Sequence, residues 1–128
     1  IEQWSVDGVQ LVNDMPDDAV KVYADDPSTA IVALTHDPRI DDMGLVQALK
    51  TDAYFIGAMG SVRTSSKRRE RLKLLELTDE EVGRLHGPVG LAIGSKTPAE
   101  IAVAILAQLT EIRSKTISTN FTENSSVR

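Results

Sequence analysis

The pattern of residues 52–69 constrains the fold of this chain more than any other feature. Ala53–Ile56 is a short apolar run, which predicts a buried strand. A turn follows at Gly57–Gly60, where glycines let the backbone bend sharply and approach a ligand closely. Hydroxyl groups and cations come next and predict a polar helix over about 62–75. A strand that leads through a tight turn into a helix is a building unit of parallel α/β sheets.

The start of the predicted helix has the composition of an anion site. Its first turn would direct unpaired N–H groups and a partial positive charge at the glycine turn. Hydroxyls and cations at this point can donate hydrogen bonds to phosphate or carboxylate oxygens. The alternative is an ordinary turn followed by a solvated basic face, because a G-x-x-G turn alone is a weak signal. The predicted anion site consists of Gly57, Met59, Gly60, Ser61, Arg63, Thr64 and Lys67.

Strand and helix patterns alternate through the first half of the chain. Thr29–Leu34 is a continuous apolar run, typical of a parallel strand that is covered on both faces. Helical patterns lie before it, from a cap at Asn13 or Asp14, and after it at 41–50. Val9–Val12 alternates and predicts a short edge strand. This order predicts an α/β fold with a mainly parallel sheet and crossover helices.

The second half contains two clear helix starts. Thr78–Glu81 is a capping box, and its helix is expected to stop at Gly87. Residues 88–94 form either a last short strand or a packed loop. A second cap at Thr97 opens a helix from Pro98 to about Arg113. This helix is apolar nearly all round, so we expect burial on more than one side, by a homodimer contact or by another segment.

The composition indicates one folded domain with a polar tail. The chain has 128 residues, 41% of them apolar and 26% charged, as in soluble globular proteins. We expect a folded domain over residues 1–113 and a disordered, Ser/Thr/Asn-rich tail over 114–128. No apolar run approaches the roughly 18 residues of a membrane helix. We therefore expect a cytoplasmic protein.

The inventory of reactive side chains excludes several kinds of site. With no cysteine, the chain has no disulfide, thiolate metal site or thiol nucleophile. Two histidines make a dedicated zinc site unexpected. No Ser-His-Asp spacing or paired-carboxylate pattern stands out, so we predict no catalytic residue. The dinucleotide fingerprint G-x-G-x-x-G is absent, because the turn after Gly57 lacks the middle glycine.

The net charge of −5 is unevenly distributed. Residues 63–73 hold six of the 14 basic side chains and one acidic one, which leaves eight basic against 18 acidic groups elsewhere. Such a chain lacks the broad basic face of a nucleic-acid-binding protein. A localised anion or an acidic protein partner fits the distribution better.

A second polar segment, Thr35-His36-Asp37, follows the apolar run at 29–34. Ligands of open parallel sheets bind beyond the carboxyl ends of the strands, so this segment would face the glycine turn if the two strands are neighbours. His36 could then donate to a phosphate or move a proton, and Asp37 could bind a hydroxyl or orient the histidine. Alternatively, Asp37 only caps the next turn. For His86 we favour a simple partner of a helix dipole.

Three segments resemble the XdhC/CoxI family of xanthine dehydrogenase accessory factors. They occur in the family's order, and the similarity extends over about residues 1–112. The segments are Ile31–Pro38, Tyr54–Thr64 and His86–Gly94.

The resemblance implies a Rossmann-like three-layer domain from the C-terminal part of these proteins. Family members help to mature molybdenum hydroxylases: they bind the molybdenum cofactor, protect it while a terminal sulfur is installed, and deliver it to the apoenzyme. That cofactor is a pterin with a terminal phosphate or nucleotide, which would suit the anion site. Gly57, Gly60, Ser61 and Arg63 would hold the phosphate, and Thr35, His36 and Asp37 would line the pocket.

The resemblance also carries expectations about partners. Because the chain has no cysteine, a cysteine desulfurase partner would supply the sulfur. Family members have an N-terminal domain and a first strand–glycine loop–helix unit, which we expect to be absent here. The exposed sheet edge would favour a homodimer or strand exchange.

Two other functions remain open from the sequence. The Rossmann-like order would also suit an NAD(P)-dependent oxidoreductase, against which the missing fingerprint counts. An interaction module without a small-molecule ligand would use the basic helix and the last helix, and charge reversal at Arg68 and Arg69 would weaken its contacts.

Overall fold

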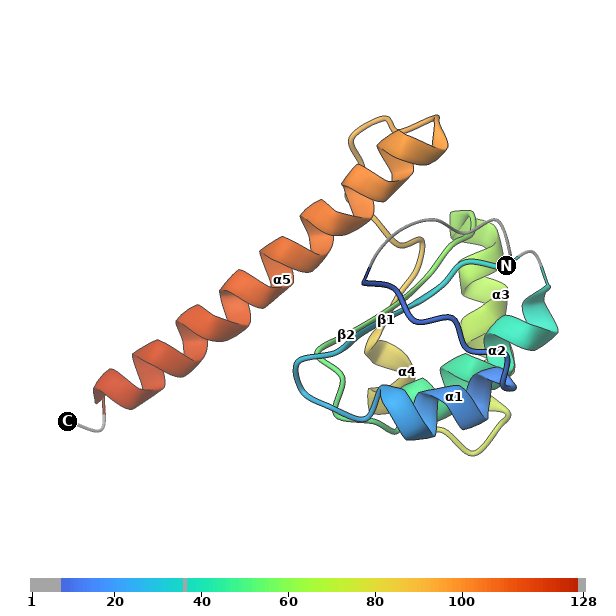
Figure 1. The fold of residues 1–128 in the computed structure, drawn as a ribbon, viewed down its shortest axis with the longest axis horizontal. Helices are drawn as coiled ribbons and strands as arrows, with labels where there is room; N and C mark the ends of the chain where they lie inside the picture. Colours follow the sequence, from blue (N-terminus) through green and yellow to red (C-terminus); the bar gives the residue numbers. More distant parts are fainter. Residues whose placement is uncertain (1–7, 36, 127–128) are drawn as a thin grey trace.

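The computed structural model describes residues 8–35 and 37–126, with side chains through Lys115 (Figure 1). Short strands alternate with helices along the chain. In order, the elements are α1 (Pro16–Tyr23), β1 (Ala30–Ala33), α2 (Pro38–Ala48), β2 (Phe55–Ala58), α3 (Val62–Lys73), α4 (Asp79–Gly83), β3 (Leu85–His86) and α5 (Pro98–Ser126).

The three strands form one parallel sheet in the order β1-β2-β3. Ile56 of the central strand lies opposite Ile31 on one side and Leu85 on the other. Parallel neighbours need crossover connections, and α2, α3 and α4 provide them. The predicted α/β class with a parallel sheet is therefore confirmed.

The core lies between the sheet and the crossover helices. It consists of side chains that are almost completely removed from water, and burial of this kind stabilises a domain by about 25 cal/mol per Å² of apolar surface. The largest are Ile56 of β2, Leu45 and Leu49 from α2 and its end, Leu72 of α3 and Val82 of α4, while Phe55 of β2 is equally buried but lies outside this cluster.

Polar side chains define where the crossover helices begin. The Asp37 carboxylate accepts a hydrogen bond from the Arg39 N–H at the start of α2. Ser61 with Thr64, and Thr78 with Glu81, form reciprocal capping boxes at α3 and α4. The expected cap of α1 at Asn13 or Asp14 is wrong, because α1 starts after Met15 without a side-chain cap.

Several predicted boundaries are also wrong. Residues 9–12 form no strand, and β2 begins two residues later than expected, so that Gly57 lies inside the strand. The helix that opens after Thr78 ends at Gly83, not at Gly87, and a two-residue strand replaces its predicted last turn. Residues 88–94 form a loop, which was one of the two alternatives.

The basic helix α3 packs differently from the prediction that its first half stands clear of the core. Ser65 and Arg68 are 1% and 6% exposed. The guanidinium group of Arg68 can be buried because Asp41 and Asp42 pair with it, so the lack of apolar residues did not indicate exposure. One side of α3, at Ser65 and Arg68, is therefore docked, whereas the other residues of its first half are exposed as expected.

Helix α5 extends away from the remainder of the chain (Figure 1). It continues to Ser126, beyond the expected end near Arg113. Within residues 98–115 only Ala104 is buried, whereas Val103 and Leu106 are 59% and 61% exposed. Among the described helices, none is both long and apolar enough to cross a membrane.

Candidate functional site

The carboxyl ends of all three strands lie at one edge of the sheet. Met59 and Gly60 follow β2, and the Met59 N–H donates to the Ala33 carbonyl at the end of β1. Gly60 adopts a φ of +151°, and a Cβ at this position would lie 2.6 Å from the Thr64 hydroxyl oxygen. The turn therefore requires glycine at this position, and it brings the backbone directly onto the start of α3.

At the start of α3, the two predicted hydroxyl donors already bind each other's backbone. The Ser61 hydroxyl accepts from the Thr64 N–H at 3.1 Å, and the Thr64 hydroxyl accepts from the Ser61 N–H at 2.8 Å. The N–H groups of Val62 and Arg63 have no hydrogen-bond partner within the described residues. The exposed side chains of Arg63 and Lys67 make no ion pair there. An anion at this point would therefore meet the two free N–H groups, and two unpaired cations lie exposed on the same helix.

The loop after β1 is held by α2. The Thr35 hydroxyl donates to the Asp41 carboxylate at 2.8 Å, and the Asp37 carboxylate caps α2. The hydrogen bond from the Arg39 side chain lowers the pKa of Asp37. Asp37 thus caps the following helix, which was the alternative to its predicted role in ligand binding. The prediction for His36 cannot be followed further, because this residue lies outside the described residues.

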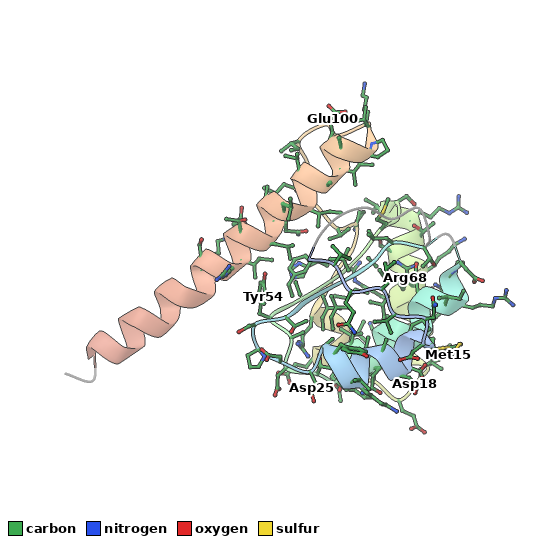
Figure 2. The ribbon with its side chains drawn as sticks, viewed as in Figure 1. Met15, Asp18, Asp25, Tyr54, Arg68 and Glu100 are labelled. Carbon is green, nitrogen blue, oxygen red and sulfur yellow. The ribbon has the colours of Figure 1, made fainter. Side chains whose placement is uncertain are left out.

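A buried polar network, which sequence reasoning did not find, links this loop to the glycine turn. Arg68, labelled in Figure 2, pairs with Asp41 and Asp42, and its Nη1 donates to the Met59 carbonyl at 3.2 Å. Asp41 is also the acceptor for Thr35. The adjacent acids Asp41 and Asp42 in α2 could have indicated partners for Arg68 only if it were known that α2 packs against α3.

The neighbouring Arg69 also has an internal role. Its Nη2 donates to the carbonyls of Leu85 and Gly87, on both sides of the end of β3. Charge reversal at Arg68 and Arg69, which was expected to weaken contacts with a partner, would therefore disturb the fold. The effect of these changes on contacts with a partner stays a prediction.

His86 lies in β3 and not in the last turn of a helix, so its predicted role as a dipole partner is wrong. Its ring stacks on Phe55 with the ring centroids 4.7 Å apart and the planes 3° apart. Burial, and then the charge of Arg69, lower the pKa of His86. Gly57, its partner in the sheet, is buried, and a Cβ there would lie 2.9 Å from the Phe55 ring. Gly57 therefore makes room for this packing.

A cavity of about 480 Å³ opens beside the glycine turn. Met59, Gly60 and Val62 form one wall, and the loop over residues 88–95 forms a second. Ile101 and Ala104 of α5 close a third side. Thr35, Asp37, Arg63 and Lys67 are not part of its lining. The structure thus joins the start of α3 to a cavity that sequence reasoning did not find.

No group of acidic or histidine side chains in the described part of the chain could hold a metal ion. The site offers N–H groups, cations and an apolar cavity. This donor set suits an anionic organic ligand better than a cation.

Comparison with known proteins identifies the family. The chain matches the XdhC Rossmann domain over residues 5–109. It is 30% identical over 88 residues to the molybdenum cofactor insertion chaperone PaoD of Escherichia coli K12, and the matched stretch covers 69% of this chain and 28% of PaoD.

Further relatives are similar over more of the chain. A probable xanthine dehydrogenase subunit of Bacillus subtilis 168 is 27% identical over 106 residues, covering 83% of this chain and 30% of that protein. A crystal structure of a xanthine dehydrogenase from Bacillus halodurans superposes with a TM-score of 0.64 at 29% identity, over 81% of this chain and 29% of that one. The chain thus spans less than a third of the length of these relatives. The match over most of the chain, together with the parallel sheet, places this protein in the XdhC Rossmann domain family.

Proposed function

We propose that this chain is the ligand-binding part of a cytoplasmic maturation factor for molybdenum hydroxylases of the xanthine dehydrogenase type. It binds the molybdenum cofactor as cargo through its phosphate and delivers it to the apoenzyme. The printed names of PaoD and of the Bacillus subtilis relative support this class of function. In this proposal the chain acts as a carrier and not as an enzyme.

The observation that carries the proposal is the cavity that begins at the N-terminus of α3. The Val62 and Arg63 N–H groups would bind the phosphate, and the side chains of Arg63 and Lys67 would add charge. Ser61 and Thr64 would hold this helix end in place through their capping box. Gly60 would let the phosphate approach the backbone, and Met59 would line the cavity.

Replacing the exposed cation at the helix start tests the phosphate site. Arg63→Ala should weaken retention of the molybdenum cofactor tenfold or more in equilibrium dialysis, because a charge-assisted hydrogen bond contributes about 1.5–3 kcal/mol. Lys73→Ala removes an exposed cation at the far end of the same helix and should leave retention unchanged. NAD(P)H, the ligand expected for the alternative function as an oxidoreductase, is titrated as the control. Saturable NAD(P)H binding, or retention unaffected by Arg63→Ala, would contradict the proposal.

Partner proteins follow from the same proposal. The apoenzyme of a molybdenum hydroxylase would receive the cargo, and a cysteine desulfurase would supply sulfur because this chain has no thiol.

We also propose a homodimer through α5, where the exposed Val103 and Leu106 border a shallow depression lined by Thr110. Light scattering should show a dimer that Leu106→Glu dissociates and Arg113→Glu does not.

A further inference from the structure

The strand β1 has one edge that no other strand of the described sheet covers. On its opposite side, the Ala33 carbonyl accepts a hydrogen bond from the Met59 N–H, which follows β2. Because successive residues of a strand bond to opposite sides, the N–H and C=O groups of Ala30 and Val32 point to the uncovered edge. These groups have no hydrogen-bond partner within the described residues. Such a row of backbone groups is a template for an added strand.

A groove follows this edge, between β1 and α1. One part is a cavity of about 270 Å³ that is lined by Leu34 and Ile40, and the other is a cavity of about 400 Å³ that is lined by Tyr23. Val20 and Val32 line both cavities, which therefore adjoin and together form what we call the edge groove. Most of its lining is apolar. Since the side chains of a strand alternate between two faces, such pockets can take every second side chain of an added strand.

Exposed apolar side chains are concentrated in the segments that form the edge groove. Of the 15 large apolar side chains that are exposed in the described part of the chain, nine lie within residues 9–43. Leu34 and Tyr23 in the lining are 53% and 52% exposed, and Val22 beside them in α1 is 69% exposed. A concentration of this kind is typical of a surface that binds another protein.

The charge of these segments indicates which kind of protein fits. Residues 9–29 contain five aspartates and one lysine, which gives a net charge of −4. Asp18 and Asp25, both labelled in Figure 2, are exposed. A second copy that paired through the same edge would bring two such surfaces together, and like charges across an interface oppose binding. A segment with lysine or arginine would be attracted instead, so the charge favours a basic partner over a second copy.

We propose that the edge groove binds an extended segment of a partner protein in which aliphatic and basic side chains alternate. The segment adds to the sheet as a strand, with hydrogen bonds to the outward backbone groups of Ala30 and Val32. An aliphatic side chain enters the cavity beside Leu34, and the cations lie near the aspartates of residues 9–29. No residue lines both the edge groove and the cavity beside the glycine turn, so this proposal is independent of the proposed cofactor site.

Three labelled peptides test the chemistry of the segment. The first alternates lysine and valine, the second has glutamate in place of lysine, and the third is the first with methylated backbone nitrogens. Each is titrated with the full chain by fluorescence anisotropy. The lysine peptide should bind at least tenfold more tightly than the other two, because only it offers both cations and backbone donors. Equal binding of the lysine and glutamate peptides, or of the methylated and unmethylated peptides, would overturn the proposal.

A matched pair of variants tests the location. Leu34→Lys places a cation at the edge groove and should weaken binding of the lysine peptide tenfold or more. Leu74→Lys makes the same change at an 84% exposed leucine at the end of α3 and should leave the affinity unchanged. In hydrogen exchange measured by nuclear magnetic resonance, the peptide should slow the outward Val32 amide more than the Ile31 amide, which faces β2. Equal effects of the two variants, or equal slowing of the two amides, would place the peptide elsewhere and overturn the assignment.

The oligomeric state separates a partner protein from a second copy. By light scattering, Leu34→Lys should leave the oligomeric state of the chain unchanged, because the edge groove takes no second copy. An assembly that Leu34→Lys dissociates and Leu106→Glu does not would show that a second copy occupies the edge, which would overturn the proposal.

Discussion

Arg68 of α3 forms an ion pair with Asp41 of α2 in which the two side chains are only 8% and 3% exposed. Nη2 and Oδ2 are 3.5 Å apart, while Asp42 accepts from the same guanidinium group and the Met59 carbonyl accepts from Nη1. Removing one member of a buried pair leaves the other charge without compensation. The network therefore maintains both the packing of the two helices and the position of the glycine turn.

Replacing Arg68 tests this network. Arg68→Met should lower the free energy of unfolding by about 3–5 kcal/mol, because Asp41 and Asp42 would lose a buried partner. Urea denaturation followed by circular dichroism measures the change. Lys67→Met alters the exposed neighbouring cation and should change stability by less than about 0.5 kcal/mol. Equal effects of the two variants would show that the buried pair does not stabilise the fold.

Two glycine replacements should act in opposite directions. A Cβ at Gly57 would lie 2.5 Å from Val89 Cγ2, so Gly57→Ala should destabilise the chain by about 1–3 kcal/mol through overpacking. At Gly83, by contrast, nothing lies within 4 Å of the added Cβ. Gly83→Ala should stabilise by about 0.4–1 kcal/mol, because it restricts the unfolded chain. Thermal unfolding of both variants measures the difference, and a stabilised Gly57→Ala protein would refute the packing around Phe55.

The stacked histidine should make stability depend on pH. Burial lowers the pKa of His86 below its unfolded value of 6.5, so the unfolded chain takes up a proton at this site before the folded chain does. The contribution of His86 to the free energy of unfolding is therefore fully present above pH 6.5, and it is lost as the pH falls toward and through the folded pKa.

The His86→Phe variant separates this contribution from those of the carboxylates, since it keeps a ring on Phe55 and cannot be protonated. Its melting temperature should change less than that of the unaltered chain between pH 7.5 and 5.5. Identical slopes for the two proteins would show that His86 is not the titrating group.

The capping box of α3 should contribute measurably to stability. Ser61→Ala removes the acceptor for the Thr64 N–H and should cost about 0.5–2 kcal/mol. Ser66→Ala, an exposed change inside the same helix, should be neutral or slightly stabilising because alanine favours helices. Chemical denaturation compares the two. A neutral Ser61→Ala variant would argue against the reciprocal cap.

Most of the fold followed from local patterns, and the exceptions have physical causes. The apolar run of β1 and the caps at Thr78 and Thr97 are complete within a few residues, so the sequence alone predicts them. The strand β3 was missed because two residues are too few to show the alternation of a strand. Gly87-Pro88 also resembles the end of a helix, which favoured a longer helix before it.

The candidate site was predictable only in part. The glycine turn and the basic helix start are contiguous in sequence, and both lie at the carboxyl edge as expected. The cavity was not predictable, because its walls come from the turn, the loop at 88–95 and α5, which meet only in three dimensions. The burial of Arg68 depends likewise on acids that lie 26 and 27 positions earlier in the chain.

Arginine side chains also complete the hydrogen bonding at the ends of this small sheet. Arg84 donates to the carbonyls of Leu49, Thr51 and Ala53 just before β2, while Arg68 binds the carbonyl that follows it. Both ends of the central strand are thus anchored by guanidinium groups from other segments. Amide hydrogens of β2 should accordingly exchange with solvent only when the whole domain opens, whereas amides of the projecting part of α5 should exchange through local fraying. In an isotope-exchange experiment the strand would report the global free energy of unfolding, even though only four residues form it.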